Sequence, residues 1–135
     1  MIETGKWPLG KIAGILSIVF FCSAAVLQAA EPSRIFILHS YEEDHICGQP
    51  QHDGVIDALS RNGFHAGKDF TLGVFYMDTK RKNNTPALIA RQAAAAMEQI
   101  EAFAPDVLVT LDDNAFKHVG LRFAGSCLFR HECTA

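Results

Sequence analysis

The chain has 135 residues, of which 12 are Lys or Arg and 15 are Asp or Glu, so its formal net charge is −3 at pH 7. This length allows one domain with a modest core. The slightly acidic balance argues against binding to nucleic acid or to an anionic membrane surface.

Residues 1–30 have the order of a secretory signal peptide. Two lysines precede an apolar stretch from 12 to 26, and small residues ending at Ala30 come before a polar segment. The apolar stretch is short for a membrane span, which needs about 20 apolar residues. We therefore expect cleavage after Ala30 and a periplasmic or otherwise exported protein. An uncleaved membrane anchor is the alternative.

Two strands and a helix are predicted in the first half of the exported part. Residues 34–38 are short, apolar and bounded by polar residues, which indicates a buried central strand. Residues 54–61 carry apolar side chains at helical spacing and end at Asn62-Gly63. The second strand, about 70–77, has a mixed pattern that is typical of a sheet edge.

A long helix, a third strand and a last helix are predicted in the second half. Thr85-Pro86 is a helix start, with a capping hydroxyl followed by a proline in the first turn. The apolar stripe of this helix consists of Ile89, Ala93, Ala96, Ile100 and Phe103. Residues 106–111 are rich in β-branched side chains and form the third strand. Asn114 is a candidate cap for the last helix, which contains Phe116, Val119 and Phe123.

The alternation of strand and helix predicts a parallel sheet in an α/β fold. We expect three layers, the strand order 2-1-3 and a flavodoxin-like topology. Residues 31–125 then form one partial lobe that follows the signal peptide. Residues 126–135 show neither strand nor helix pattern, and we interpret them as an irregular tail.

Polar clusters follow each predicted strand, at the edge where open α/β sheets bind ligands. In the order 2-1-3, His39-Ser40-Tyr41 faces Asp112-Asp113-Asn114 across one crevice, whereas 78–82 is a basic loop beside the edge strand, where charged residues are usually solvated. The candidate ligand-binding residues are Ser40, Tyr41, Asp112 and Asn114. The alternative is structural: Asp112 and Asn114 cap the last helix, and Ser40 satisfies loop amides.

Catalytic and metal-binding motifs are weak in this sequence. Zinc ligands could come from Cys47 with His45 and His52, or from Cys127 with His131 and Cys133, but neither group has a paired C-x-x-C spacing. Familiar phosphate-binding or nucleophile motifs are also absent. We therefore expect no enzyme and no cofactor, with a metal-dependent hydrolase as the alternative from another class. A disulfide between Cys127 and Cys133, or three unpaired thiols after cleavage, are both open.

Several segments taken together resemble the ABC-transporter substrate-binding proteins with a type 1 periplasmic-binding fold. These segments are Ile37-Leu38-His39-Ser40-Tyr41, Tyr76-Met77-Asp78-Thr79-Lys80-Arg81, Pro105-Asp106-Val107-Leu108-Val109 and Asp112-Asp113-Asn114-Ala115. The resemblance covers about residues 34–120 and extends to extracytoplasmic sensor modules of histidine kinases. It implies binding of a small polar solute and delivery to a membrane permease, with Ser40, Tyr41, Asp112 and Asn114 contributed by the first lobe.

The chain departs from that family in two respects. Relatives often have an aromatic residue soon after Ser-Tyr, where this chain has His45-Ile46-Cys47. A two-lobed binding protein also needs about twice the domain size available here. We therefore expect a truncated or frameshifted form that supplies half of a cleft and binds solute poorly, if at all. A sensor domain is the alternative within the same class.

Overall fold

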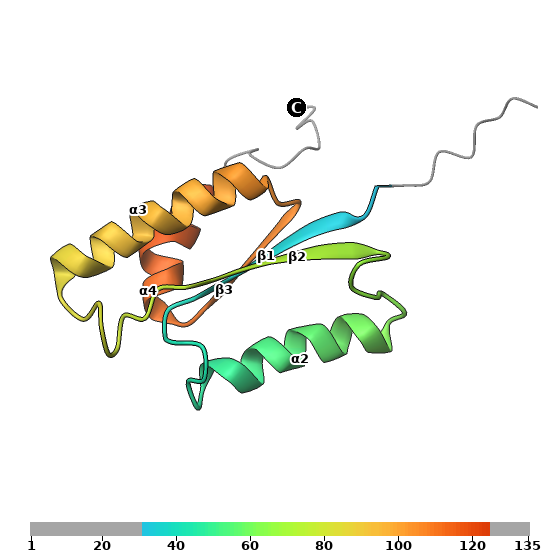
Figure 1. The fold of residues 1–135 in the computed structure, drawn as a ribbon, viewed down its shortest axis with the longest axis horizontal. Helices are drawn as coiled ribbons and strands as arrows, with labels where there is room; N and C mark the ends of the chain where they lie inside the picture. Colours follow the sequence, from blue (N-terminus) through green and yellow to red (C-terminus); the bar gives the residue numbers. More distant parts are fainter. Residues whose placement is uncertain (1–30, 125–135) are drawn as a thin grey trace, which may run out of the picture. The chain divides into compact units, whose positions relative to one another are not determined.

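A computed structural model of the chain describes residues 31–124. The predicted signal peptide and the tail at 126–135 lie outside the described residues. The described part contains a parallel sheet in the order β2-β1-β3, as predicted (Figure 1). The three strands are β1 at Ser33–His39, β2 at Phe70–Tyr76 and β3 at Val107–Leu111. Their carboxyl ends are level, because His39 pairs with both Tyr76 and Leu111.

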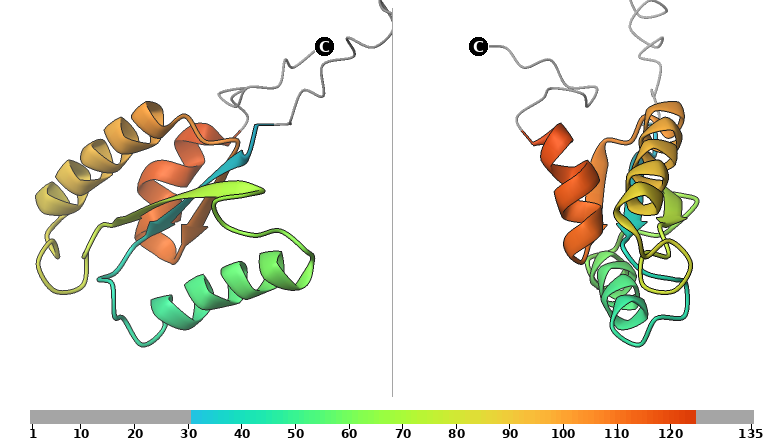
Figure 2. Two further views of the ribbon diagram at one scale, coloured as in Figure 1. Left: turned by 45° about the vertical axis from the view of Figure 1, so that its right-hand side comes forward. Right: turned by 90° about the vertical axis from the view of Figure 1, so that its left-hand side faces the viewer.

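β1 is the central strand, and its side chains alternate between two cores. Phe36 and Leu38 pack on the side of α3 (Pro86–Phe103), whereas Ile35 and Ile37 pack on the side of α2 (Gly48–Arg61). Both faces of β1 are therefore buried, which explains its continuous apolar run. The helices lie on opposite faces of the sheet, so the predicted three layers are confirmed (Figure 2).

β2 lies at one edge of the sheet, as its mixed pattern predicted. Gly73 in this strand allows close contact with the central strand, because a Cβ there would lie 2.6 Å from Cδ2 of Phe36 and 3.3 Å from Cδ2 of Phe103. Any larger residue at this position would displace two aromatic rings of the core.

α3 forms as predicted. The side chain of Thr85 accepts a hydrogen bond from the backbone N–H of Leu88, and Pro86 occupies the first turn. Its stripe faces the sheet, with Ala93, Ala96 and Ile100 buried. None of the helices within residues 31–124 is long and apolar enough to span a membrane.

α2 begins at Gly48, six residues before the predicted start. Residues 49–53 contain no apolar periodicity, so the pattern was visible only from Val55 onward. The physical reason is that the first turns of α2 lie beside the carboxyl edge of the sheet, where they contact polar groups rather than the core.

The last helical segment runs without a break through α4 (Asp113–Ala115), the π-helical η1 (Phe116–Gly120) and α5 (Leu121–Phe123). Its predicted cap was wrong. Asp112 occupies the N-cap position, and its side chain makes no capping hydrogen bond. The hydroxyl of Ser40 instead accepts a hydrogen bond from the backbone N–H of Ala115. The cap therefore comes from the residue that follows β1 and not from the sequence of the helix itself.

Candidate functional site

The segments that follow the three strands meet at the carboxyl edge of the sheet. The backbone N–H of Ser40 donates to the carbonyl of Leu111 at 3.0 Å. Thr79, after β2, donates its backbone N–H and its hydroxyl to the carbonyl of Ser40, at 2.9 and 2.7 Å. The polar clusters recognised in the sequence therefore form one continuous hydrogen-bonded surface.

Ser40 lies inside this surface rather than on it. Its side chain is fully buried, and its hydroxyl donates to the carbonyl of Leu111 at 2.8 Å and accepts from the backbone N–H of Ala115 at 2.8 Å. Both contacts join β1 to the last helix. The geometry matches the structural alternative, in which Ser40 satisfies loop amides.

Asn114 also makes an internal contact. Its side-chain amide donates to the hydroxyl of Thr79 at 2.9 Å, so it ties the β3 segment to the β2 segment. Since Thr79 in turn donates to Ser40, the chain of bonds crosses all three strand ends. Asn114 thus holds the edge together, while its side chain stays partly exposed.

Tyr41 presents a half-buried aromatic ring at this edge. The ring of His45 lies 4.3 Å from its centroid, and the ammonium of Lys80 lies 4.9 Å above it, within cation–π range. Burial, followed by the negative charges of Asp112 and Asp113 and by Cys47, raises the pKa of the Tyr41 phenol above its usual 10.0. The phenol therefore remains a hydrogen-bond donor at neutral pH, beside the acidic end of β3.

Asp112 has the most unusual geometry of the candidate residues. Its backbone has φ 68° and ψ 178°, a region that is nearly restricted to glycine. One carboxylate oxygen, Oδ1, accepts from the side-chain amide of Gln51 at 3.4 Å. The other, Oδ2, is buried and has no hydrogen-bond partner among residues 31–124. Asp112 therefore combines a strained backbone with a buried carboxylate oxygen that has no hydrogen-bond partner among residues 31–124.

The loop after β2 is packed more tightly than the sequence indicated. Met77 and Thr79 are buried, whereas the basic residues Lys80, Arg81 and Lys82 are exposed, as expected of a charged loop beside an edge strand. Arg81 pairs with Glu42 at 3.0 Å. The reason is that the backbone of Thr79 continues the pairing with Ser40 beyond the strand, which draws the loop against the sheet.

A polar cavity of about 330 Å³ lies between the loops that follow β1 and β2. It is lined by Glu42, Glu43, Asp44, Tyr76, Asp78, Arg81 and Lys82. The crevice predicted from the sequence was between β1 and β3, whereas this cavity lies between the loops after β1 and β2 at the same edge of the sheet. Its opposite charges are partly paired with each other, as in the contact of Arg81 with Glu42.

His39 and His52 were missed as a pair. His39 ends β1 and is 1% exposed, and its Nε2 lies 3.0 Å from Nδ1 of His52 on α2. Burial and then the charge of His52 lower the pKa of His39 to about 4. The signal in the sequence was a histidine that ends an apolar strand, but its partner could not be found because the start of α2 was not predicted.

Metal-binding geometry does not occur in the described part of the chain. Within residues 31–124, no three His, Cys, Asp or Glu side chains are grouped as ligands. Cys47 is exposed and free of a disulfide. The second set of zinc candidates, at 127–133, lies outside the described residues.

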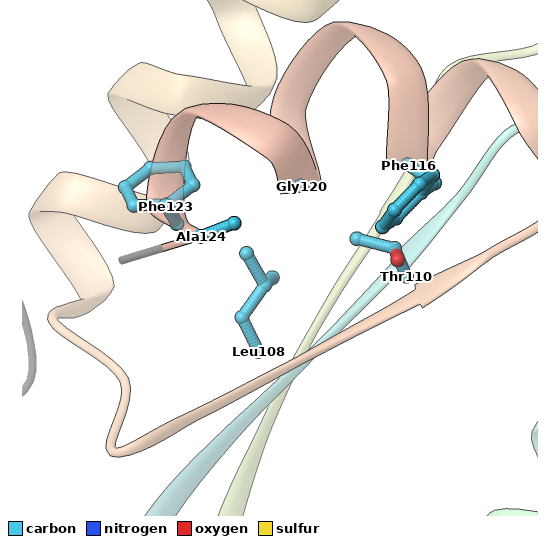
Figure 3. Close-up of a pocket in the computed structure, with 6 residues that line it drawn as sticks. All are labelled: Leu108, Thr110, Phe116, Gly120, Phe123 and Ala124. Atoms are coloured by element: carbon cyan, nitrogen blue, oxygen red, sulfur yellow. The ribbon is translucent and has the colours of Figure 1, made fainter. Parts of the chain in front are cut away.

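An apolar groove of about 220 Å³ runs between β3 and the last helix (Figure 3). Its lining consists of Leu108, Thr110, Phe116, Gly120, Phe123 and Ala124. Thr110 is its one polar side chain, so the groove offers little to orient a polar solute. The carboxyl edge of the sheet is the better candidate site.

No protein-family model, curated protein or solved structure matches the chain.

Proposed function

We propose that the described residues form one wall of a binding cleft for a small polar solute. We further propose that the protein acts outside the cytoplasm, as the solute-binding component of an ABC uptake transporter with a membrane permease as its partner. The transport role rests on the resemblance of the sequence segments described above. The binding role rests on the geometry of Asp112.

Asp112 supports binding because a purely structural residue at this position would be glycine. Holding a non-glycine residue in this backbone region costs about 1 to 3 kcal/mol. A buried carboxylate oxygen without a donor adds a further cost. A ligand N–H or O–H that donates to Oδ2 would offset the second cost, and this is the observation on which the proposal depends.

The neighbouring groups suggest the class of solute. The Tyr41 ring offers an apolar face and a hydroxyl, and Lys80 lies over that ring as a cation. A small neutral or zwitterionic molecule with a flat face and several hydrogen-bond donors fits these groups, as nucleosides and aromatic amino acids do. Because one wall leaves much of the ligand in water, we expect weak, millimolar affinity.

The test compares two neighbouring aspartates in the full chain. NMR spectra are recorded with uridine, L-tryptophan or D-ribose at about 10 mM, which is sufficient for millimolar binding. We expect shifts near Tyr41 with at least one probe. The Asp112→Gly variant should lose these shifts and gain about 1 to 2 kcal/mol in stability, because strain is relieved.

Asp113→Gly is the matched control. Asp113 is exposed and occupies the first turn of the last helix, so its loss should weaken the helix slightly and leave the shifts intact. If none of the three probes shifts resonances at the carboxyl edge, the proposed function is wrong. If Asp112→Gly keeps them, binding occurs without Asp112 and the assigned role fails.

A further inference from the structure

Two side-chain contacts connect the first turns of α2 to the carboxyl edge of the sheet. Gln51 donates to Oδ1 of Asp112, and the next residue, His52, contacts His39. The rest of the helix is held by apolar packing of Val55, Ile56 and Leu59 against the sheet. The position of the first turns is therefore set by polar contacts, which are directional and specific.

The two imidazole rings lie edge to edge. Their centroids are 5.2 Å apart and their planes differ by 23°, while Nε2 of His39 and Nδ1 of His52 are 3.0 Å apart. The facing nitrogens thus lie between the two rings and close to both ring planes. This is the geometry of an N–H···N hydrogen bond, which requires a single proton between the nitrogens.

His39 is fixed on its other sides as well. The ring of Tyr76 lies 4.4 Å away, centroid to centroid, at 31°. Gly48 lies beside the ring, so that a Cβ on it would be in van der Waals contact with Nδ1 of His39, at 3.5 Å. His39 has little freedom to move, so any loss of the contact must displace His52 and the first turns of α2.

The charged and titratable groups around the pair come from three elements. His52 faces His39 from α2, and Tyr76 faces it from β2. The acidic Glu43 and Asp44, from the loop after β1, act with Asp53 on Tyr76 and raise its phenol pKa after the effect of burial. A first added proton enters at an outer ring nitrogen and leaves the N–H···N contact intact. Only protonation of both rings puts N–H against N–H, and burial, followed by the charge of His52, opposes the charge on His39.

We propose that His39 and His52 are a positioning pair, whose shared proton holds the first turns of α2 so that Gln51 remains at Asp112. The pair acts through Gln51 and touches no solute itself. Protonation of both rings breaks the contact and frees the start of α2, which makes access to the Asp112 carboxylate dependent on pH. This inference rests on the proposed function for its consequence, but the positioning itself exists without a solute.

Hydrogen exchange of the ligand-free full chain tests the positioning. Removal of the contact by His52→Ala should raise the exchange of the backbone amides at 52–56 about fivefold to tenfold, as expected for one lost hydrogen bond. The amides of α3 should not change. His52→Gln, which can still donate to Nε2 of His39, should restore most of the protection. His65→Ala removes an exposed histidine after α2 and serves as the control.

Acid provides the second readout. After correction for intrinsic rates, protection at 52–56 should fall in the wild type as the pH decreases through about 4, where His39 takes up its proton, before protection in α3 falls. It should be flat in His52→Ala. Unchanged exchange at 52–56 in His52→Ala, or loss of protection in α2 and α3 together, would overturn the proposal. Neither outcome depends on solute, so a failure of the proposed function is seen separately in the solute titration.

Discussion

The hydroxyl of Ser40 accepts a hydrogen bond from the backbone N–H of Ala115, 75 residues later in the chain, at 2.8 Å. The same hydroxyl donates to the carbonyl of Leu111 at 2.8 Å. The Ser40 side chain thus connects the end of β1 to the end of β3 and to the start of the last helix. Ser40, which was expected to bind a ligand at the carboxyl edge of the sheet, instead stabilises that edge as a buried residue.

Ser40→Ala should destabilise the chain by about 1 to 3 kcal/mol, because the buried N–H of Ala115 loses its partner. The measurement is the free energy of unfolding from urea denaturation. Ser60→Ala, at an exposed position of α2, is the control and should change stability by less than about 0.5 kcal/mol. Equal effects of the two variants would show that the Ser40 bridge contributes nothing.

Two glycines are expected to respond in opposite directions to the same substitution. Gly73→Ala places a Cβ against Phe36 and Phe103, so we expect a loss of about 1 to 3 kcal/mol. Gly54→Ala, inside α2 with nothing within 4 Å of the new Cβ, should gain about 0.5 to 1 kcal/mol from helix propensity. Thermal unfolding of both variants checks the sign of each change.

Stability should fall in acid because of His39. Its folded-state pKa of about 4 lies below the unfolded value of 6.5, so the unfolded chain takes up the proton first. The contribution is fully present above pH 6.5, decreases as the pH falls below that value and is lost once the pH passes 4. Its size is on the order of 2 to 3 kcal/mol. His39→Leu should remove this part of the pH dependence, measured by urea unfolding at several pH values; an unaltered profile would contradict the assignment.

The two tyrosines of the chain, Tyr41 and Tyr76, should both titrate above pH 10 in the folded state. Because each folded pKa is raised, this contribution to stability is present below pH 10 and is lost as the pH rises through the folded pKa values. Phenolate absorbance follows the titration directly. Asp112→Asn should lower the pKa of Tyr41 and Glu43→Gln that of Tyr76, although burial remains the larger cause in each case. Shifts that appear in the wrong tyrosine would show that the acidic groups are placed differently.

The sequence predicted the elements that depend on local pattern. Thr85-Pro86 marked the start of α3 because a capping hydroxyl and an N1 proline act within one turn. The apolar run of β1 indicated a central strand because both of its faces are covered. The alternation of strands and helices predicted a parallel sheet, the order 2-1-3 was expected because it is common in doubly wound sheets, and the structure confirms both.

The sequence did not show which of the four candidate binding residues are buried and structural and which are exposed at the carboxyl edge. Ser40, Tyr41, Asp112 and Asn114 formed one group by their place after the strands, but the fold buries Ser40 and exposes part of Tyr41. The start of α2 was missed because its first turns pack on polar groups, and with it the partner of His39. The cap of the last helix was missed because it comes from a distant residue.

Periodicity, capping residues and connection lengths are local properties, so the sequence predicted the strands, the helices apart from the start of α2, and the edge at which their polar ends gather. The strain and unsatisfied oxygen of Asp112, the internal bridge made by Ser40 and the contact of His39 with His52 arise only in the folded chain. Those outcomes depend on atoms brought together from residues 13 to 75 positions apart, and such distances in space are set by packing of the whole sheet and its helices.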